Sequence, residues 1–139
     1  MLRLKIITPK KIVFDQDVDA VSVPSADGVL TILKHHANLF SLLVDGILKI
    51  RIKDQEQFLS IGGGYLETNG EETFVLVSKA HGQDEIDKSV TEKAVADVKQ
   101  ILTKSMDEKE RQEASALLRR SLIDLKLLTK KKAPKSFNE

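Results

Sequence analysis

Gly62–Gly64 are the residues whose type and spacing could bind a phosphate, because consecutive glycines can direct several backbone N–H groups at one anion. A Walker-type loop needs a Lys and a Ser or Thr after the glycines, and a dinucleotide-binding loop needs a helix that starts there. Here Tyr65–Thr68 follow, then an Asn69-Gly70 turn and another apolar run. Because no helix N-terminus is expected at this place, the sequence does not predict a phosphate site.

The same glycines have a structural interpretation. A glycine in or beside a strand often marks a bulge, or a place where another backbone comes too close for a Cβ atom. We therefore expect a strand to run through Gly62–Gly64 toward the Asn69-Gly70 hairpin. We expect Gly63→Ala to harm folding or the binding of a partner chain and to leave nucleotide affinity unchanged. A nucleotide-dependent enzyme built on these glycines would need a Lys or Arg close to them, and none is close in sequence.

The three histidines are the next candidates for chemistry. Adjacent residues of a strand point to opposite faces, so one metal ion would not easily bind both His35 and His36. No Asp or Glu stands at metal-ligand spacing beside them, and His81 lies far along the chain. We interpret His35-His36 as a surface turn, and we predict no metal site.

Cysteine, serine and carboxylate side chains do not form a recognisable catalytic site in this sequence either. The chain has no cysteine, which excludes disulfides, thiolate catalysis and Cys-ligated zinc. No serine lies in a G-x-S-x-G pattern or beside a plausible histidine base. The carboxylates within residues 84–87 and 107–113 fit the solvated starts of helices. The sequence therefore predicts no catalytic residues, no cofactor and no enzyme activity of its own.

Composition limits the remaining classes of function. The 139 residues are 41% hydrophobic and 31% charged, as in a soluble globular domain with a small appendage. A net charge of +1 argues against general affinity for nucleic acid or anionic lipid. No apolar run approaches the roughly 18 to 20 residues that span a bilayer, so we expect no membrane insertion. The N-terminal residues alternate like a strand, so we expect neither a signal peptide nor a transit peptide.

Up to about residue 80 the hydrophobic pattern has a period of two, which is typical of strands with one buried face. The clearest case is Leu48–Lys53, where Leu and Ile alternate with Lys and Arg. Turn signals separate the runs at Thr8-Pro9, Pro24–Gly28, Asp45-Gly46 and Asn69-Gly70. Short strands without helices between them predict an antiparallel β-sandwich or barrel over residues 1–82.

After Gly82 the period becomes helical. A first apolar stripe consists of Ile86, Val90, Ala94, Val98 and Ile101 or Leu102, and a second consists of Ala114, Leu117, Leu118, Leu122, Leu125 and Leu128. Ser105 and Glu108 fit a capping box between the two helices. The fold class is thus α+β, with an antiparallel helical hairpin and a basic tail over residues 83–139. The final residues, 131–139, are expected to fray.

The helical hairpin has an implication for function. Two helices alone have too little mutual apolar contact to be very stable, because helical stability in water comes mostly from packing. Their stripes need the sandwich, a partner chain, or both in alternation. A module that can dock in two places is a candidate switch.

The order of these elements, with the residues in them, resembles the epsilon subunit of the F-type proton-translocating ATP synthase over essentially the whole chain. No single motif is decisive, but their order and spacing together are specific. The resemblance is carried by Thr8-Pro9, Val21–Pro24, Asp27-Gly28, Gly28–Leu33, His36–Leu39, Leu43, Gly46–Ile50, Phe58–Glu67 and the Ile86-Asp87 pair.

The resemblance implies a non-catalytic rotor subunit. In that family the sandwich binds the central gamma stalk and rests on the c-ring, which couples proton flow to ATP formation at the beta subunits. The segment facing the c-ring would be Lys34–Leu39, namely Lys34, His35, His36, Ala37, Asn38 and Leu39. The implied location is peripheral, on the cytoplasmic face of the bacterial inner membrane, or alternatively on the stromal face of the plastid thylakoid.

The resemblance also assigns a regulatory role to the helices, which fold against the sandwich or extend along gamma and restrain ATP hydrolysis. Basic residues of the second helix would then meet an acidic loop on beta. The candidates here are Arg111, Arg119, Arg120 and Lys126. Taken by themselves, these charges also fit a solvated helix face that nearby glutamates partly neutralise.

Two departures from the family pattern affect specific sites. Asn38 and Lys34 stand where prolines are common, so we expect a less rigid loop facing the c-ring. Some bacterial members bind ATP at an Ile/Leu-Asp-x-x-Arg-Ala motif, of which this chain has only Ile86 and Asp87. Val90 replaces the Arg, so we expect weak or no ATP binding and no cofactor.

An alternative interpretation is an unrelated β-sandwich binding module that forms a homodimer through its helical hairpin. It predicts a stable dimer that is lost when the residues after Gly82 are deleted.

Overall fold

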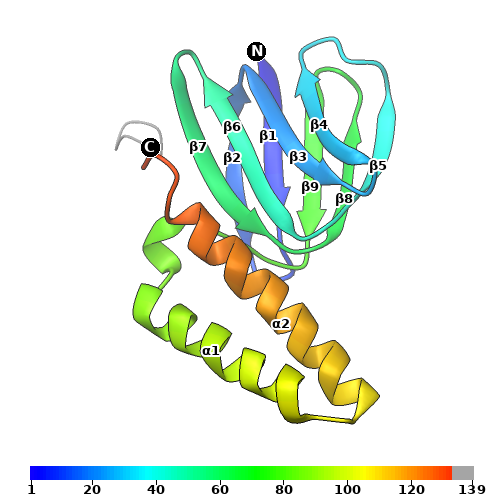
Figure 1. Cartoon of the computed structure of the whole chain (residues 1–139). Coiled ribbons are helices and arrows are strands. Elements are labelled where there is room, and N and C mark those ends of the chain that lie inside the picture. Colours follow the sequence, from blue (N-terminus) through cyan, green and yellow to red (C-terminus); the bar gives the residue numbers. More distant parts are fainter. Residues whose placement is uncertain (133–139) are drawn as a thin grey trace.

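The computed structural model describes residues 1–132 and shows a rolled β-structure beside two helices (Figure 1). The strands are β1 (Leu2–Ile7), β2 (Ile12–Val18), β3 (Ala20–Ser25), β4 (Gly28–Leu33), β5 (Leu39–Leu43), β6 (Gly46–Ile52), β7 (Gln55–Ile61), β8 (Gly64–Thr68), β9 (Glu72–Val77) and the short β10 (Ala80–His81). A 3-10 turn η1 (Gln83–Glu85) leads to α1 (Lys88–Lys104) and α2 (Glu108–Leu127). The predicted order of a β-sandwich followed by a helical hairpin is confirmed.

The strands form one curved sheet in the order β10-β7-β6-β3-β5-β8-β9-β1-β2, with β4 paired to β3. Neighbours are antiparallel, as predicted, except that β1 and β9 run parallel. Strand β3 changes its neighbour along its length, since Ala20–Ser22 pair with β6 and Ser25 pairs with β5. This change of partner lets the sheet turn back on itself, so that its two layers enclose one core.

The core is made by the apolar faces of alternating strands. Leu2, Leu4 and Ile6 are fully buried in β1, and Leu48 and Ile50 are fully buried in β6, as the period of two predicts. The buried cluster is drawn entirely from the sandwich strands. The sandwich therefore completes its own core, and the helices pack on its outside.

The glycine run lies at a corner of the sheet. Strand β7 ends at Ile61 and β8 begins at Gly64, and the two strands pair with different neighbours. The expected single strand through the glycines is therefore wrong, because Gly62 and Gly63 carry the chain from one part of the sheet to another. The close approach is correct, since a Cβ atom on Gly64 would lie 2.0 Å from the backbone O of Leu76. Gly63 is less restricted, with Leu43 O at 3.4 Å.

The helices begin and end at polar caps that differ from the predicted one. The carboxylate of Asp87 accepts a hydrogen bond from Val90 N at the start of α1, and Asp107 accepts from Lys109 N at the start of α2. The predicted capping box of Ser105 with Glu108 is wrong, because Ser105 instead ends α1. Its hydroxyl accepts a hydrogen bond from Asp107 N, which fixes the turn between the helices.

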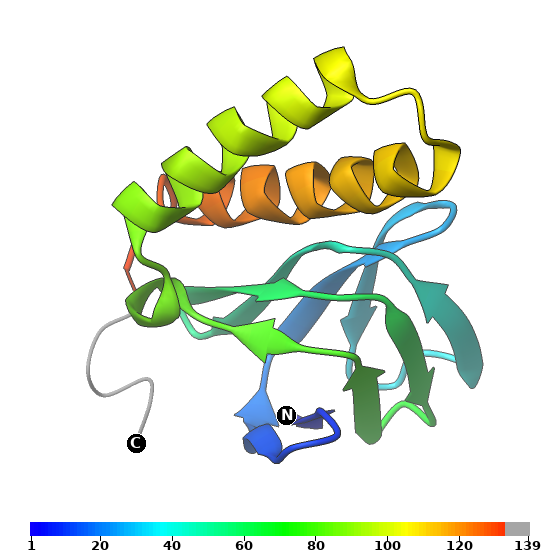
Figure 2. The same cartoon turned by 90° about the horizontal axis from the view of Figure 1, so that it is seen from below.

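The two helices form a hairpin in which α2 lies between α1 and the sheet (Figure 2). Helix α2 contacts β6 and β7, and its buried residues are Ala114, Ser121 and Leu127. In α1 the buried residues are Val95 and Val98. The predicted stripes are thus confirmed in part, since Val98 and Ala114 are buried and most of the other members are half-buried. Val90, Leu117 and Leu122, which were predicted to be buried, are exposed at 64%, 45% and 46%.

Candidate interaction surfaces

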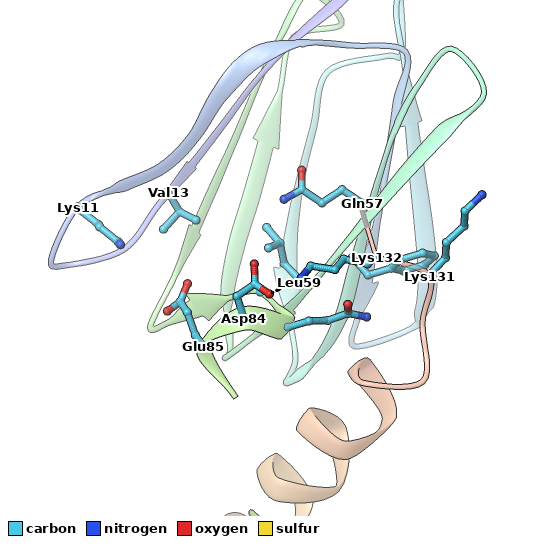
Figure 3. Close-up of a pocket in the computed structure, with 11 residues that line it drawn as sticks. Lys11, Val13, Gln57, Leu59, Asp84, Glu85, Lys131 and Lys132 are labelled. Carbon is cyan, nitrogen blue, oxygen red and sulfur yellow. Dashed lines mark ion pairs between the residues drawn. The ribbon is translucent and has the colours of Figure 1, made fainter. Parts of the chain in front are cut away.

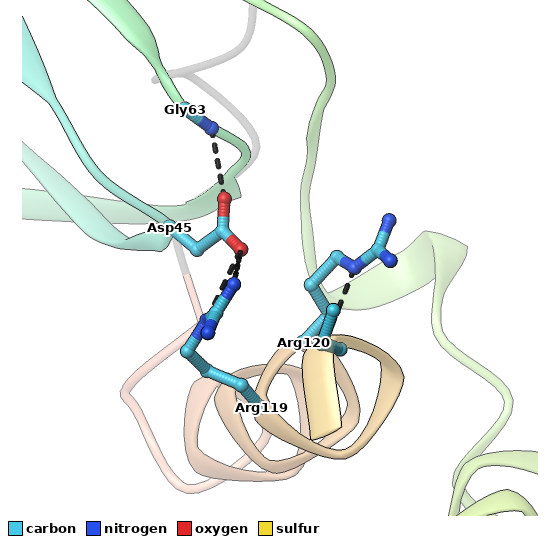
Figure 4. Close-up of polar contacts among 5 residues, drawn as sticks. Asp45, Gly63, Arg119 and Arg120 are labelled. Atoms are coloured by element: carbon cyan, nitrogen blue, oxygen red, sulfur yellow. Dashed lines mark hydrogen bonds and ion pairs between the residues drawn. The ribbon is translucent and has the colours of Figure 1, made fainter. Parts of the chain in front are cut away.

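The first polar contact between α2 and the sandwich joins Arg119 to Asp45, in the turn between β5 and β6 (Figure 4). Arg119 Nη2 lies 3.2 Å from Asp45 Oδ2, and Arg119 Nε lies 3.4 Å from the same oxygen. The other carboxylate oxygen accepts a hydrogen bond of 2.9 Å from Gly63 N. The glycine corner therefore holds an anion after all, but it is a carboxylate of the chain itself.

A second contact lies further along α2. Asp124 Oδ1 accepts a hydrogen bond of 2.8 Å from the Ser60 hydroxyl of β7 and lies 2.8 Å from His81 Nε2 of β10. The side chains of His81 and Asp124 are only 17% and 21% exposed. This partly buried contact requires α2 in its docked position, because one carboxylate serves donors from two strands.

A third set of contacts holds the C-terminal end of α2. The Gln83 side-chain amide donates hydrogen bonds of 2.7 Å to the carbonyls of Leu127 and Lys130. Lys130 lies over the ring of Phe58, 5.5 Å from its centroid, and Lys132 Nζ pairs with Asp84 at 3.0 Å. Gln83, Asp84 and Lys132 line a pocket of about 240 Å³ between the sandwich and the start of the hairpin (Figure 3).

The four basic candidates have different surroundings in this conformation. Arg111 donates to the carbonyls of Leu102 and Ser105, so it caps the C-terminal end of α1. Arg119 contacts Asp45, and Arg120 Nε donates to Ala116 O of its own helix (Figure 4). Lys126 borders an open, mainly apolar groove of about 380 Å³ together with Arg119 and Leu122. The four basic residues therefore differ in role in this conformation, since the contacts of Arg111 lie within the hairpin.

Within the segment Lys34–Leu39, residues 34–38 form the predicted turn after β4, and Leu39 begins β5. His35 has a positive φ of 68°, and its N–H donates to Gly70 O at 2.7 Å. A Cβ atom on Gly70 would come within 2.6 Å of His36 O. The turn between β8 and β9 thus contacts this segment at His35 and His36.

Strand β4, strand β5 and the turn after β5 each carry exposed apolar side chains that were not singled out from the sequence. They are Val29, Leu33, Phe40, Leu42 and Val44. Phe40 stacks on Tyr65 of β8, with ring centroids 5.2 Å apart. The sequence of β5, LFSLL, does not alternate, so only the structure shows that Phe40 and Leu42 lie on the face opposite the buried Leu43. Such a surface is typical of a protein–protein contact.

The partial ATP motif lies where α1 begins. Ile86 ends η1 and Asp87 caps α1, and both line a pocket of about 720 Å³ with Val90 and three lysines, Lys10, Lys11 and Lys79. Within residues 1–132 no three His, Cys, Asp or Glu side chains come together as a metal site would require. No helix in this part of the chain is long and apolar enough to cross a membrane.

These features define a class of protein: a β-sandwich with a docked helical hairpin, whose described residues include exposed apolar side chains on the sandwich and basic side chains on α2. Residues 1–83 match the family model described as ATP synthase, Delta/Epsilon chain, beta-sandwich domain. The chain belongs to this ATP synthase delta/epsilon family.

Relatives of similar chain length support this membership. The chain is 34% identical to the ATP synthase epsilon chain of Dehalococcoides mccartyi over 133 residues, which cover 94% of each chain. It is 32% identical to the cyanelle ATP synthase epsilon chain of Cyanophora paradoxa, over 94% of this chain and 98% of the relative. The likeness therefore includes the hairpin as well as the sandwich.

Solved structures show the same fold. A chain of the Euglena gracilis mitochondrial ATP synthase, in a structure of OSCP, F1 and c-ring, superposes with a TM-score of 0.80 at 21% identity, over 90% of this chain and 79% of that one. A chain of the Tetrahymena thermophila mitochondrial ATP synthase, in a structure of the central stalk and c-ring, gives 0.61 at 16% identity, over 92% and 96%.

Proposed function

We propose that the chain is the epsilon subunit of an F-type ATP synthase, a non-catalytic part of the rotor that couples proton translocation to ATP synthesis. The observation that carries this proposal is the match to epsilon chains along 94% of the sequence, through both the sandwich and the hairpin. We also propose that residues 1–82 and 83–139 act as two units, because the sandwich core contains no residue of the hairpin.

The sandwich has two surfaces that suit the two rotor partners. The apolar side chains of β4 and β5, with Phe40 at 59% exposed, are the part that we assign to the gamma subunit. The turn of residues 34–39, supported by Gly70, is the part that we assign to the c-ring. The location that follows is peripheral, on the cytoplasmic face of a bacterial inner membrane or the stromal face of a thylakoid.

The hairpin is the regulatory part of the proposal. Its docking rests on few buried side chains and on polar contacts at Asp45, Asp124 and Gln83. An undocked hairpin would extend along gamma and present Arg119, Arg120 and Lys126 to an acidic surface on beta, thereby restraining ATP hydrolysis. Arg111 contributes through the turn that joins the helices.

Deleting the residues after Gly82 tests this regulatory part. Complexes assembled with the truncated chain are expected to hydrolyse ATP faster than complexes with the full chain, because the restraining helices are missing. Equal rates would refute the inhibitory role and leave assembly with gamma open to a separate test.

ATP binding by this subunit is expected to be weak or absent, because Val90 cannot contact phosphate as an Arg would. Titration of the full chain with millimolar ATP should leave the amide chemical shifts of Ile86 and Asp87 unchanged. Clear, saturable shifts at those residues would refute this expectation.

The alternative of a homodimer formed through the hairpin has a specific observation in its favour, since Leu117 and Leu122 are about half exposed on α2. Sedimentation of the purified chain separates the two proposals. A monomer that associates with gamma supports the rotor subunit, and a dimer that dissociates after deletion of the hairpin supports the alternative.

A further inference from the structure

One side of α2 combines a cation with apolar surface. Arg119 and Lys126 flank the groove lined by Leu118, Leu122 and Ile123, and the Arg119 side chain is 61% exposed. Positive charge beside apolar side chains fits a partner segment that carries carboxylates. In this structure Arg119 already forms an ion pair with a carboxylate, that of Asp45.

Asp45 is held in place independently of the arginine. Its side chain is only 18% exposed, and its Oδ1 accepts the hydrogen bond from Gly63 N at the corner between β7 and β8 (Figure 4). Only Oδ2 faces Arg119. The carboxylate is therefore positioned by the sandwich backbone before α2 arrives, which lowers the entropic cost of forming the contact.

We propose that Asp45 is an internal competitor for the acidic partner of α2. While the hairpin is docked, Asp45 forms an ion pair with Arg119. An external carboxylate must displace Asp45 before it can bind Arg119. The inference rests on the proposed function, since it assumes that α2 meets an acidic surface. The new element of the proposal is that Asp45 of this chain makes the contact with Arg119 that the acidic surface would otherwise make.

The strength of this competition follows from exposure. Contacts between exposed ion pairs contribute about 0.2–1 kcal/mol, which corresponds to roughly a 1.4- to 5-fold change in affinity. Asp45 would thus weaken external binding without preventing it. The two other polar contacts of the hairpin, at Asp124 and Gln83, involve no basic side chain that borders the groove.

A matched pair of substitutions in the full chain tests the proposal. Asp45→Asn keeps an oxygen for Gly63 N but removes the charge, and Asp124→Asn removes one negative charge from the other contact. Both variants raise the net charge equally. The probe is an eight-residue polyglutamate peptide at low salt, with binding followed by the peptide's fluorescent label.

Asp45→Asn is expected to tighten peptide binding about two- to fivefold more than Asp124→Asn does, and Arg119→Gln added to Asp45→Asn should abolish that gain. Equal gains in the two single variants would overturn the proposal, because they would reflect net charge or loosened docking alone. No gain for Asp45→Asn would also overturn it.

The unaltered chain provides a second measurement that does not depend on a variant folding. During the same titration, the NMR signals of Arg119 Nε–H and Gly63 N–H should shift together. The peptide would break the contact between Arg119 and Asp45, and Gly63 N–H is hydrogen-bonded to the same Asp45 carboxylate. A shift at Arg119 with none at Gly63 contradicts competition. Peptide results of either kind are independent of the hydrolysis assay, so failure of the competitor and failure of the proposed function are distinguishable.

Discussion

Single residues at the corner between β7 and β8 determine how the chain passes from one strand to the next, and one of them, Gly63, donates the hydrogen bond that positions Asp45. Three consecutive glycines could be found from the sequence, and their exclusion as a nucleotide loop could be argued from the residues around them. Which glycine lacks room could not be predicted, because the restricting atom is Leu76 O of β9, a strand whose register is set by the whole sheet.

Gly64→Ala is therefore expected to destabilise the protein by about 1–3 kcal/mol or more, since the added methyl group would overlap the backbone at Leu76 and Val77. Chemical denaturation of the purified variant measures this loss. Gly63→Ala is the matched control and should change stability by less than about 1 kcal/mol, contrary to the expectation from the sequence. A larger loss for Gly63→Ala than for Gly64→Ala would contradict the described corner.

Among the candidate site residues, the sequence indicated the position of the turn at His35-His36 and the start of α1 at Asp87. It did not indicate that Arg111 caps the turn between the helices or that Asp45 binds Arg119. These contacts join residues far apart in sequence or across a turn, and their side chains have no periodic pattern that would reveal them. That Phe40 and Leu42 lie on the exposed face of β5 is visible only once the register is known.

At the scale of the elements, strands were predicted more accurately than helix faces. Alternation with a period of two has only two phases, so Leu48 and Ile50 could be assigned to the core directly. Helix stripes allow rotation by a fraction of a turn, and the hairpin buries Val95 and Ser121 instead of Val90 and Leu122. Some of the side chains that α2 buries or turns toward β7, such as Ser121 and Asp124, are polar. The apolar pattern of the sequence therefore does not identify the buried face of α2.

The contact at Asp124 makes a prediction about how firmly this element docks. Asp124→Ala would leave the Ser60 hydroxyl, in a residue 3% exposed, without its acceptor, at a cost of about 1–3 kcal/mol. Amide hydrogen exchange in α2 should accelerate accordingly, while exchange in β1 and β9 stays unchanged because their core lies within the sandwich. Asp97→Ala, on the exposed surface of α1, is the control. Equal exchange rates in the two variants would mean that Asp124 does not hold the hairpin.

For the whole molecule, two properties follow from the separation between the sandwich core and the helices. Under the proposed function, the sandwich would keep its fold and its partner surfaces when the hairpin moves, and the hairpin would exchange its internal contacts for external ones. The proposed function would require this arrangement, because the same chain would have to stay attached to a rotor and also restrain it.

Co-purification with a gamma subunit and c-ring tests the central claim most directly, with the full chain and the chain ending at Gly82 compared side by side. We predict that both chains bind, because the apolar surface of β4 and β5 and the turn of residues 34–39 lie in the sandwich. Failure of both folded chains to associate with gamma and the c-ring would contradict the assignment to the rotor.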